Sequence, residues 1–252
     1  MRTLTRYTVE EVFEVVDCIE RDDIGALPDE LGDLLFQIVF YARIAEEEGR
    51  FGFGDVVARV VDKLTRRHPH VFAGAPLLSA AEEHVRWEQI KQAERGARRN
   101  EPLSALADVP QALPALMRAL KLQARAARVG FDWSSVPPVL AKIEEEIAEL
   151  QAAVAAGEAN GVEAELGDLL FSCVNLARHL GVDPETALRR TNSRFEKRFR
   201  YMEMAAATAG QSLEELSAAA QDCLWEDAKR ALDDPPASGG PACDLKPPSS
   251  CP

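Results

Sequence analysis

Apolar and polar residues follow one another along most of the chain with the spacing of amphipathic helices, as in residues 113–129. Strictly alternating runs of β-branched and aromatic residues, which would indicate strands, are scarce. Helix-start signals agree with this pattern: prolines at 137 and 138, an Asp-Pro-Glu tripeptide at 183–185, and Thr8 and Ser212, each three residues ahead of a glutamate in the form of a capping box. We therefore predict an all-α protein.

An internal repeat organises the chain. Residues 30–36 (ELGDLLF) recur letter for letter as residues 165–171, at an offset of 135. At the same offset the acidic string 10–14 (EEVFE) matches residues 145–149 (EEIAE). Duplicated core packing would explain the repeated Leu and Phe, but it would not explain why the acidic positions repeat as well. We therefore predict two related helical-bundle units.

Composition along the chain predicts the boundaries of these units. The proline-bearing segment 101–114 is expected to be a linker between a first unit, 1–100, and a second unit, 115–232. Residues 233–252 are rich in Pro, Gly and Ser, which predicts a disordered tail. The amphipathic stretch that opens the second unit would have its counterpart before residue 1. We expect either that the first unit lacks its opening helix or that the natural start lies upstream.

The repeated acids have the spacing of a metal site. In the second unit Glu146 and Glu149 share one helix face, and Glu165 and Asp168 share another. A short glycine-containing connection suits an antiparallel hairpin that would bring the four carboxylates together, where they would repel one another unless a cation neutralised them. An all-oxygen shell without His selects Mg²⁺, or else Mn²⁺, over zinc. The matching acids of the first unit form a possible second metal site: Glu11, Glu14, Glu30 and Asp33.

A solvated helix face is the ordinary explanation of an acidic pair three residues apart. That explanation is weaker here, because the pairs within 30–36 and 165–171 are set in apolar strings that we expect to lie toward a core. Each string also holds a glycine, which costs a helix about 1 kcal/mol relative to alanine. Close helix approach near a metal is the expected compensation.

Net charge, apolar run length and cysteine spacing argue against several classes of protein. The net charge of −13, from 42 acidic and 29 basic residues, argues against nonspecific nucleic-acid binding. There is no apolar run of about 18 residues, so we expect no membrane span. The five cysteines are scattered and form no C-x-x-C pair, which is typical of thiols in a reducing compartment. We therefore expect a cytoplasmic protein.

Longer strings carry a resemblance to a known family. The pattern Glu-Glu-x-x-Glu, a spacer, then Glu-x-x-Asp resembles the signature of the all-α nucleoside triphosphate pyrophosphohydrolases. Four strings resemble the two-domain MazG proteins in particular: 31–36 (LGDLLF), 67–72 (RHPHVF), 113–118 (LPALMR) and 129–133 (VGFDW). The resemblance runs from about residue 6 to residue 231, and the ordered, duplicated set is highly specific.

The resemblance implies a reaction and the residues that perform it. It implies Mg²⁺-dependent hydrolysis of a nucleoside triphosphate between the α and β phosphates, by a homodimer whose second unit carries the activity. The implied metal ligands are Glu146, Glu149, Glu165 and Asp168. The implied catalytic residues are Glu145, Glu149, Arg194, Arg198 and Lys229.

Substrate contacts follow in the same way. Trp225 is the implied neighbour of the nucleotide, and the repeat makes Trp87 and Lys91 weaker candidates in the first unit. Position 194 is commonly Lys in the family and is Arg here, which keeps the charge but changes the hydrogen-bond geometry. From motif position alone we expect Glu149 to bridge the metal and the attacking water.

Three alternatives stay open at this point. The acidic sites could hold metal and nucleotide without turnover, as a regulatory module. The enzyme could be a narrower hydrolase for dUTP, dCTP or a damaged nucleotide, because base selection depends on the shape of a pocket. A purely structural helical protein would show no dependence on metal.

Overall fold

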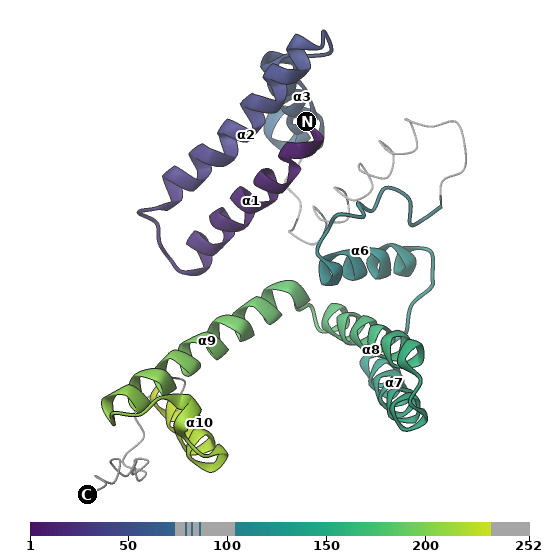
Figure 1. The fold of residues 1–252 in the computed structure, drawn as a ribbon. Helices are drawn as coiled ribbons and strands as arrows, with labels where there is room; N and C mark the ends of the chain where they lie inside the picture. Colours follow the sequence, from purple (N-terminus) through teal and green to yellow (C-terminus); the bar gives the residue numbers. More distant parts are fainter. Residues whose placement is uncertain (74–78, 80–81, 83–85, 87–103, 233–252) are drawn as a thin grey trace, which may run out of the picture. The chain divides into compact units, whose positions relative to one another are not determined.

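The computed structural model describes residues 1–73, 79, 82, 86 and 104–232 (Figure 1). Every regular element within these residues is helical, and none of them is a strand, so the prediction of an all-α protein is confirmed. The chain divides into two compact units, Met1–Glu101 and Pro102–Pro252. The predicted tail, 233–252, lies outside the described residues. Among the helices described, none is both long and apolar enough to cross a membrane.

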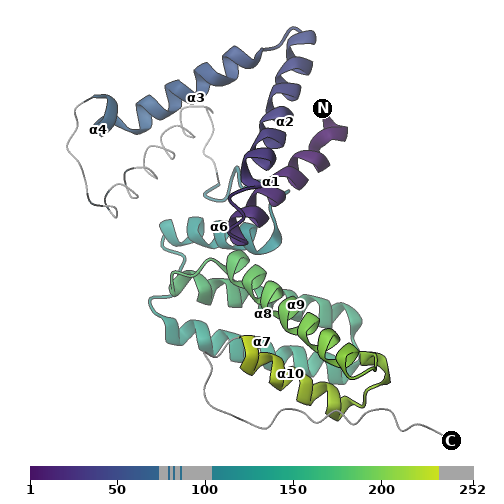
Figure 2. The same cartoon turned by 90° about the vertical axis from the view of Figure 1, so that its left-hand side faces the viewer.

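The first unit is built on a helical hairpin. Helices α1 (Thr5–Glu20) and α2 (Leu27–Glu47) lie side by side, as the views in Figures 1 and 2 agree. A short 3₁₀ turn, η1 (Arg2–Leu4), precedes them, and α3 (Phe53–Arg67) and α4 (Pro69–Phe72) follow.

One predicted helix start in this unit is wrong. Thr8 lies inside α1, because the helix already begins at Thr5. Its hydroxyl therefore finds no free N-terminal amide and instead donates a hydrogen bond to the Tyr41 hydroxyl on α2, at 2.9 Å.

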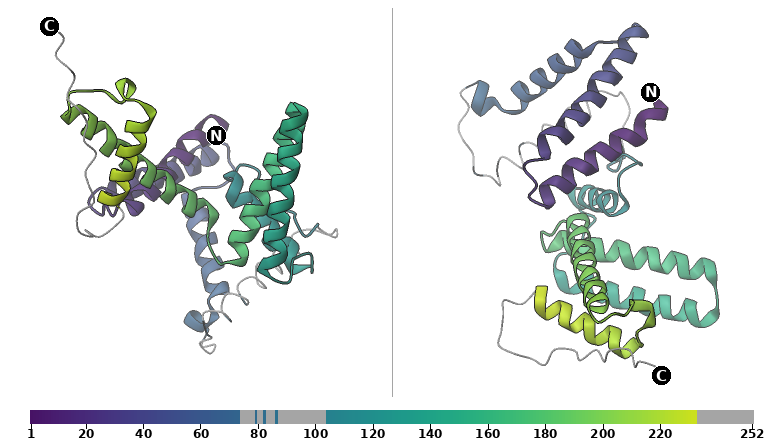
Figure 3. Two further views of the ribbon diagram at one scale, coloured as in Figure 1. Left: turned by 90° about the horizontal axis from the view of Figure 1, so that it is seen from below. Right: turned by 60° about the vertical axis from the view of Figure 1, so that its left-hand side comes forward.

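The second unit contains a longer hairpin and a second helix pair. Helices α7 (Val136–Ala156) and α8 (Ala159–His179) run side by side, most clearly in the right-hand view of Figure 3. Gly157 closes α7 in the left-handed conformation, at φ 70°, where a side chain would be strained. Helix α6 (Ala115–Arg128) packs on α8 and also contacts α9 (Pro184–Thr208).

The starts of α7 and α9 match their predictions. Prolines occupy the first turn of α7. Asp183 caps α9, with a carboxylate oxygen accepting a hydrogen bond from the Thr186 amide at 2.7 Å. After η2 (Leu213–Glu215), helix α10 (Ala218–Leu232) returns along α9. The two helices enclose a small core of Met202, Ala206, Leu224 and Ala228.

The apolar strings around the repeated acids do not lie in a core, contrary to expectation. Phe36 is 58% exposed and Leu170 is 51% exposed. A Cβ built on Gly32 or on Gly167 would meet no atom within 4 Å. Among the described residues no helix therefore approaches either glycine closely, contrary to the expected compensation.

Candidate functional site

The hairpin of the second unit brings three of the predicted metal ligands together. Glu165 and Asp168 are one turn apart on α8, and Glu146 faces them from α7. One carboxylate oxygen from each lies within 4.8 Å of the others. Glu146 is buried, at 4% exposed, whereas Asp168 is open to solvent. The group therefore offers converging oxygens on a surface that a solute can reach.

Glu149, the fourth predicted ligand, lies beside this group and outside the tight set. It is exposed, one turn beyond Glu146 on α7. Its charge still acts on the cluster, because the pKa of Glu165 is raised first by desolvation and then by repulsion from Glu149, Glu146 and Asp168. The four carboxylates form one electrostatic cluster of which three have ligand-like spacing.

A lysine that sequence reasoning missed completes the cluster. The Lys142 ammonium lies 2.8 Å from a carboxylate oxygen of Glu146 and 2.9 Å from one of Glu145. Its hydrogen bonds to these two glutamates raise the pKa of Lys142. The spacing of three and four residues on one helix was the signal that could have identified it. Glu145, a predicted catalytic residue, is thus paired with a cation on its own helix.

The first unit assembles a related but different group. There the carboxylates of Glu11, Glu14 and Glu30 lie within 4.8 Å of one another, and Asp33 is outside the set. Desolvation and then repulsion from Glu11 raise the pKa of Glu14, and desolvation and then Glu14 do the same for Glu30. The position equivalent to Lys142 is Tyr7.

The predicted basic residues gather on the other helix pair of the second unit. Arg194 donates a hydrogen bond to Thr191 at 3.2 Å on α9, and the Lys229 ammonium lies 2.6 Å from Glu226 on α10. The Arg198 guanidinium stacks over the Trp225 ring, 5.4 Å from its centroid. The structure thus places the cations and Trp225 on α9 and α10, and the carboxylates on α7 and α8. Two predicted residues, Trp87 and Lys91, lie outside the described part of the chain.

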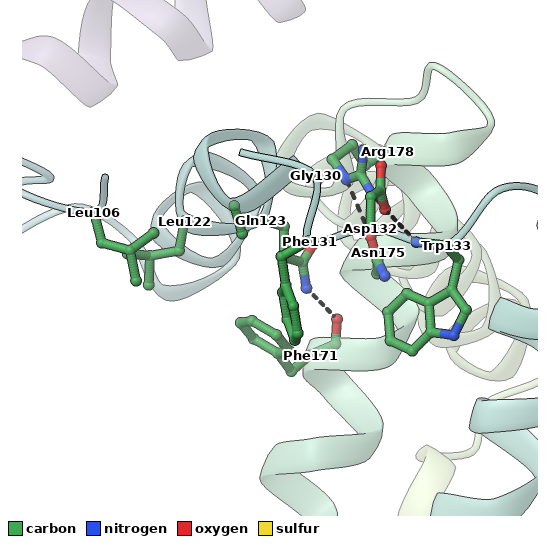
Figure 4. A pocket seen from close by; sticks show the side chains of 11 residues that line it. Leu106, Leu122, Gln123, Gly130, Phe131, Asp132, Trp133, Phe171, Asn175 and Arg178 are labelled. Carbon is green, nitrogen blue, oxygen red and sulfur yellow. Dashed lines mark hydrogen bonds and ion pairs between the residues drawn. The ribbon is translucent and has the colours of Figure 1, made fainter. Parts of the chain in front are cut away.

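A pocket of about 580 Å³ opens in the second unit (Figure 4). Phe131 and Phe171 both line it, and Phe171 follows the ligand candidate Asp168 by one turn of α8. Gln123 is buried in the wall: its amide nitrogen donates to the Phe171 carbonyl at 2.8 Å, and its side-chain oxygen has no hydrogen-bond partner. Pockets of this size with few polar groups commonly bind small organic molecules.

A network of charged and polar side chains forms another part of the pocket wall. The Arg178 guanidinium donates to the Asp132 carboxylate and, at 3.0 Å, to the Asn175 side-chain oxygen. Arg178, more than its second partner His179, lowers the pKa of Asp132. Asp132 belongs to a string quoted above for its family resemblance, but nothing in the sequence assigned it to a pocket wall.

Comparisons with known proteins agree with this architecture. Residues 1–72 match the model of the MazG nucleotide pyrophosphohydrolase domain, and residues 113–195 match that of phosphoribosyl-ATP pyrophosphohydrolase. A nucleoside triphosphate pyrophosphohydrolase of Escherichia coli is 49% identical over 230 residues, which cover 90% of this chain and 87% of that protein. The nucleoside triphosphate pyrophosphohydrolase/pyrophosphatase MazG of Thermotoga maritima is 42% identical over 227 residues, covering 90% and 85%.

Proposed function

The chain belongs to the MazG family of pyrophosphohydrolases, and from this we propose that it hydrolyses nucleoside triphosphates to a monophosphate and diphosphate. It is a hydrolase that acts on phosphoric anhydrides, the reaction class to which the names of its relatives refer. The observation that carries the proposal is the group of Glu146, Glu165 and Asp168, whose oxygens converge within 4.8 Å. A divalent metal held by these carboxylates would also bind the negatively charged phosphate oxygens of a triphosphate.

Mg²⁺ is the cofactor that the donor set fits, with Mn²⁺ as a substitute. All three candidate ligands are carboxylates, which hard divalent cations prefer. Their oxygens already lie within 4.8 Å of one another, so Glu146, Glu165 and Asp168 would hold one ion after small side-chain movements. When bound, the metal would supply an activated water and would polarise the phosphoryl oxygens.

The remaining side chains would then direct the attack to the α phosphorus. Glu149 is exposed beside the ligand group, where its carboxylate can orient a water molecule or accept its proton. Glu145 lies on the adjoining face of α7 and would support it. Arg194, Arg198 and Lys229 would stabilise the charge on the departing diphosphate.

The pocket between α6 and α8 is suited to the base of the nucleotide. Its two phenylalanine rings offer stacking surfaces, and the Gln123 amide nitrogen, which donates to the Phe171 carbonyl, fixes the wall that carries one of them. The pocket begins one turn beyond Asp168 on the same helix, so one ligand could occupy both places. Trp225 stays a prediction for a further contact with the nucleotide.

We also propose that two copies of the chain associate. Large apolar side chains of the α7–α8 hairpin are half exposed, and a single chain leaves them in contact with water. They include Leu140, Ile147, Leu166 and Leu170. Light scattering of the purified protein would test this, and a monomer at micromolar concentration would contradict it.

Product analysis tests the reaction itself. The protein would be incubated with each nucleoside triphosphate and Mg²⁺, alongside Glu149→Gln and the matched first-unit variant Glu14→Gln. We expect a monophosphate and diphosphate, formed by wild type and Glu14→Gln and lost in Glu149→Gln. Release of inorganic phosphate and a nucleoside diphosphate would refute the chemistry. Stabilisation by the nucleotide without turnover would favour a binding module instead.

A further inference from the structure

A lysine lies against the second acidic cluster at a position where the first unit has a tyrosine. In the second unit the Lys142 ammonium lies 2.8 Å from an oxygen of Glu146 and 2.9 Å from one of Glu145. At the repeat offset of 135 the first unit has Tyr7 in this position, so its cluster has no lysine there. The difference falls on a helix turn that adjoins the converging carboxylates in both units.

Burial separates this ion pair from an ordinary surface pair. Exposed pairs of this spacing contribute little, because water already solvates both charges. The Glu146 side chain, however, is only 5% exposed, so it depends on Lys142 for much of its compensation. The Lys142 side chain is 32% exposed and has a flexible four-carbon stem, so it has a route toward solvent that Glu146 lacks.

The Glu146 carboxylate can bind either the Lys142 ammonium or a divalent metal ion. Glu146 belongs both to the lysine pair and to the group with ligand-like spacing. A divalent ion bound to that group would repel an ammonium held against one of its own ligands. Metal binding therefore favours separation of Lys142 from Glu146. The ammonium would keep the exposed Glu145 carboxylate as a partner, and a triphosphate bound to the metal would add a second.

We propose that Lys142 is a built-in counter-ion that competes with the metal for Glu146 and, once displaced, binds the phosphates of the nucleotide. This rests on the function proposed above and adds a regulatory property to the same site. Metal alone leaves the displaced lysine with the solvated carboxylate of Glu145, whereas metal with a triphosphate adds a multiply charged partner. The two ligands therefore bind cooperatively, and each raises the affinity for the other by the same factor.

Direct measurement of Mn²⁺ binding tests the proposal without relying on turnover. Free Mn²⁺ would be followed by electron paramagnetic resonance in a Glu30→Gln background, which disables the first cluster. The titration is made with and without a non-hydrolysable α,β-methylene nucleoside triphosphate. In the Lys142→Met variant we expect Mn²⁺ alone to bind at least about threefold tighter than in the Lys142 protein, and the gain from the nucleotide to fall at least about fivefold.

Two matched variants separate charge from structure. Lys142→Arg keeps the charge, so its affinity for Mn²⁺ alone should stay within about twofold of the lysine protein. Lys121→Met removes an exposed lysine from α6 and should leave the affinity for Mn²⁺ unchanged. Thermal unfolding in chelator would identify any variant that fails to fold, and Lys142→Arg then carries the comparison through its retained nucleotide coupling.

The outcomes distinguish this proposal from the one on which it rests. If the parent binds Mn²⁺ and hydrolyses nucleotides, but Lys142→Met binds Mn²⁺ alone equally or more weakly, the counter-ion role is overturned and the enzyme function stands. If the parent neither binds Mn²⁺ nor hydrolyses any triphosphate, both proposals fail. Tighter metal binding with unchanged nucleotide coupling would overturn the role of Lys142 as a phosphate ligand.

Discussion

The two hairpins use the same repeated positions and yet converge on different carboxylates. Two members of each group are equivalent at the repeat offset of 135: Glu11 and Glu30 in the first unit correspond to Glu146 and Glu165 in the second. The third member differs: the first unit takes a second acid from α1, and the second unit takes a second acid from α8. The groups are Glu11, Glu14 and Glu30 in one, and Glu146, Glu165 and Asp168 in the other.

The connections between the helices provide a physical reason for this difference. In the second unit two residues, 157–158, join α7 to α8, and Gly157 makes the sharp turn. In the first unit six residues, 21–26, join α1 to α2, and a proline in the first turn delays the start of α2. Equivalent acids thus lie at different distances from the end of their hairpin. A shared sequence motif therefore does not guarantee a shared ligand set.

The matched pair Glu165→Gln and Glu30→Gln tests this comparison with the largest expected effect. Glu165 belongs to the second group of candidate metal ligands, so its loss should reduce turnover at least about 100-fold. Loss of a residue that only supports a metal ligand typically costs about 10- to 100-fold. Glu30→Gln should change turnover less than twofold if the second unit alone is catalytic. Steady-state rates at saturating Mg²⁺ would decide. Equal losses in both variants would mean that both units turn over.

The aromatic positions Phe171 and Phe36 give a second matched pair. Phe171 lines the pocket, whereas its repeat equivalent Phe36 stacks on Phe40 with ring centroids 5.7 Å apart. Loss of one stacking surface costs about 1–3 kcal/mol of base binding, so Phe171→Ala and Phe131→Ala should raise KM roughly 5- to 100-fold with little change in kcat. Phe36→Ala should leave KM unchanged. A fall in kcat alone would remove the pocket from the proposed substrate site.

The sequence was sufficient for features that depend on local spacing. The repeat offset predicted a helical hairpin in each unit, since a helix places residues three and four apart on one face. The start signals predicted the proline-led start of α7 and the Asp183 cap of α9, whereas the start predicted at Thr8 was wrong. The i,i+4 spacing of Lys142 and Glu146 follows from the same helix geometry. The spacing alone does not show that this ion pair is partly buried, because that depends on the burial of Glu146.

Features that depend on tertiary packing were not predictable in this way. The exposure of Phe36, the open space at Gly167 and the buried oxygen of Gln123 are decided by which helix covers which face. The string that holds Phe36 is apolar, and apolar composition alone suggested a core. An apolar string is compatible both with a buried core and with an exposed face, so the sequence pattern alone cannot separate the two.

The equivalent arginines Arg178 and Arg43 predict a smaller, pH-dependent difference. Asp132, the partner of Arg178, has a lowered pKa, so its stabilisation is present above the ordinary value of 3.8 and is lost as the pH falls through the lower folded value. Asp132→Asn should reduce the free energy of unfolding by roughly 1 kcal/mol at pH 7 and by less near pH 3. Glu47→Gln, which removes an exposed partner of Arg43, should have a smaller effect. Urea unfolding at both pH values measures this, and a constant difference would contradict the assignment.

Gly32 and Gly167 give the smallest and most discriminating comparison. Because an added Cβ meets no atom of the described residues within 4 Å at either position, alanine should stabilise each helix by about 0.5–1 kcal/mol through its higher helix propensity. Thermal unfolding of dilute, metal-free protein should show both gains. At concentrations where two copies associate, Gly167→Ala should instead weaken association if the partner approaches that face of α8. A gain at 32 with a loss of association at 167 would locate the covered surface on the second hairpin. Gains at both positions with unchanged association would show that neither glycine is needed for close approach, and the partner surface would then have to lie elsewhere.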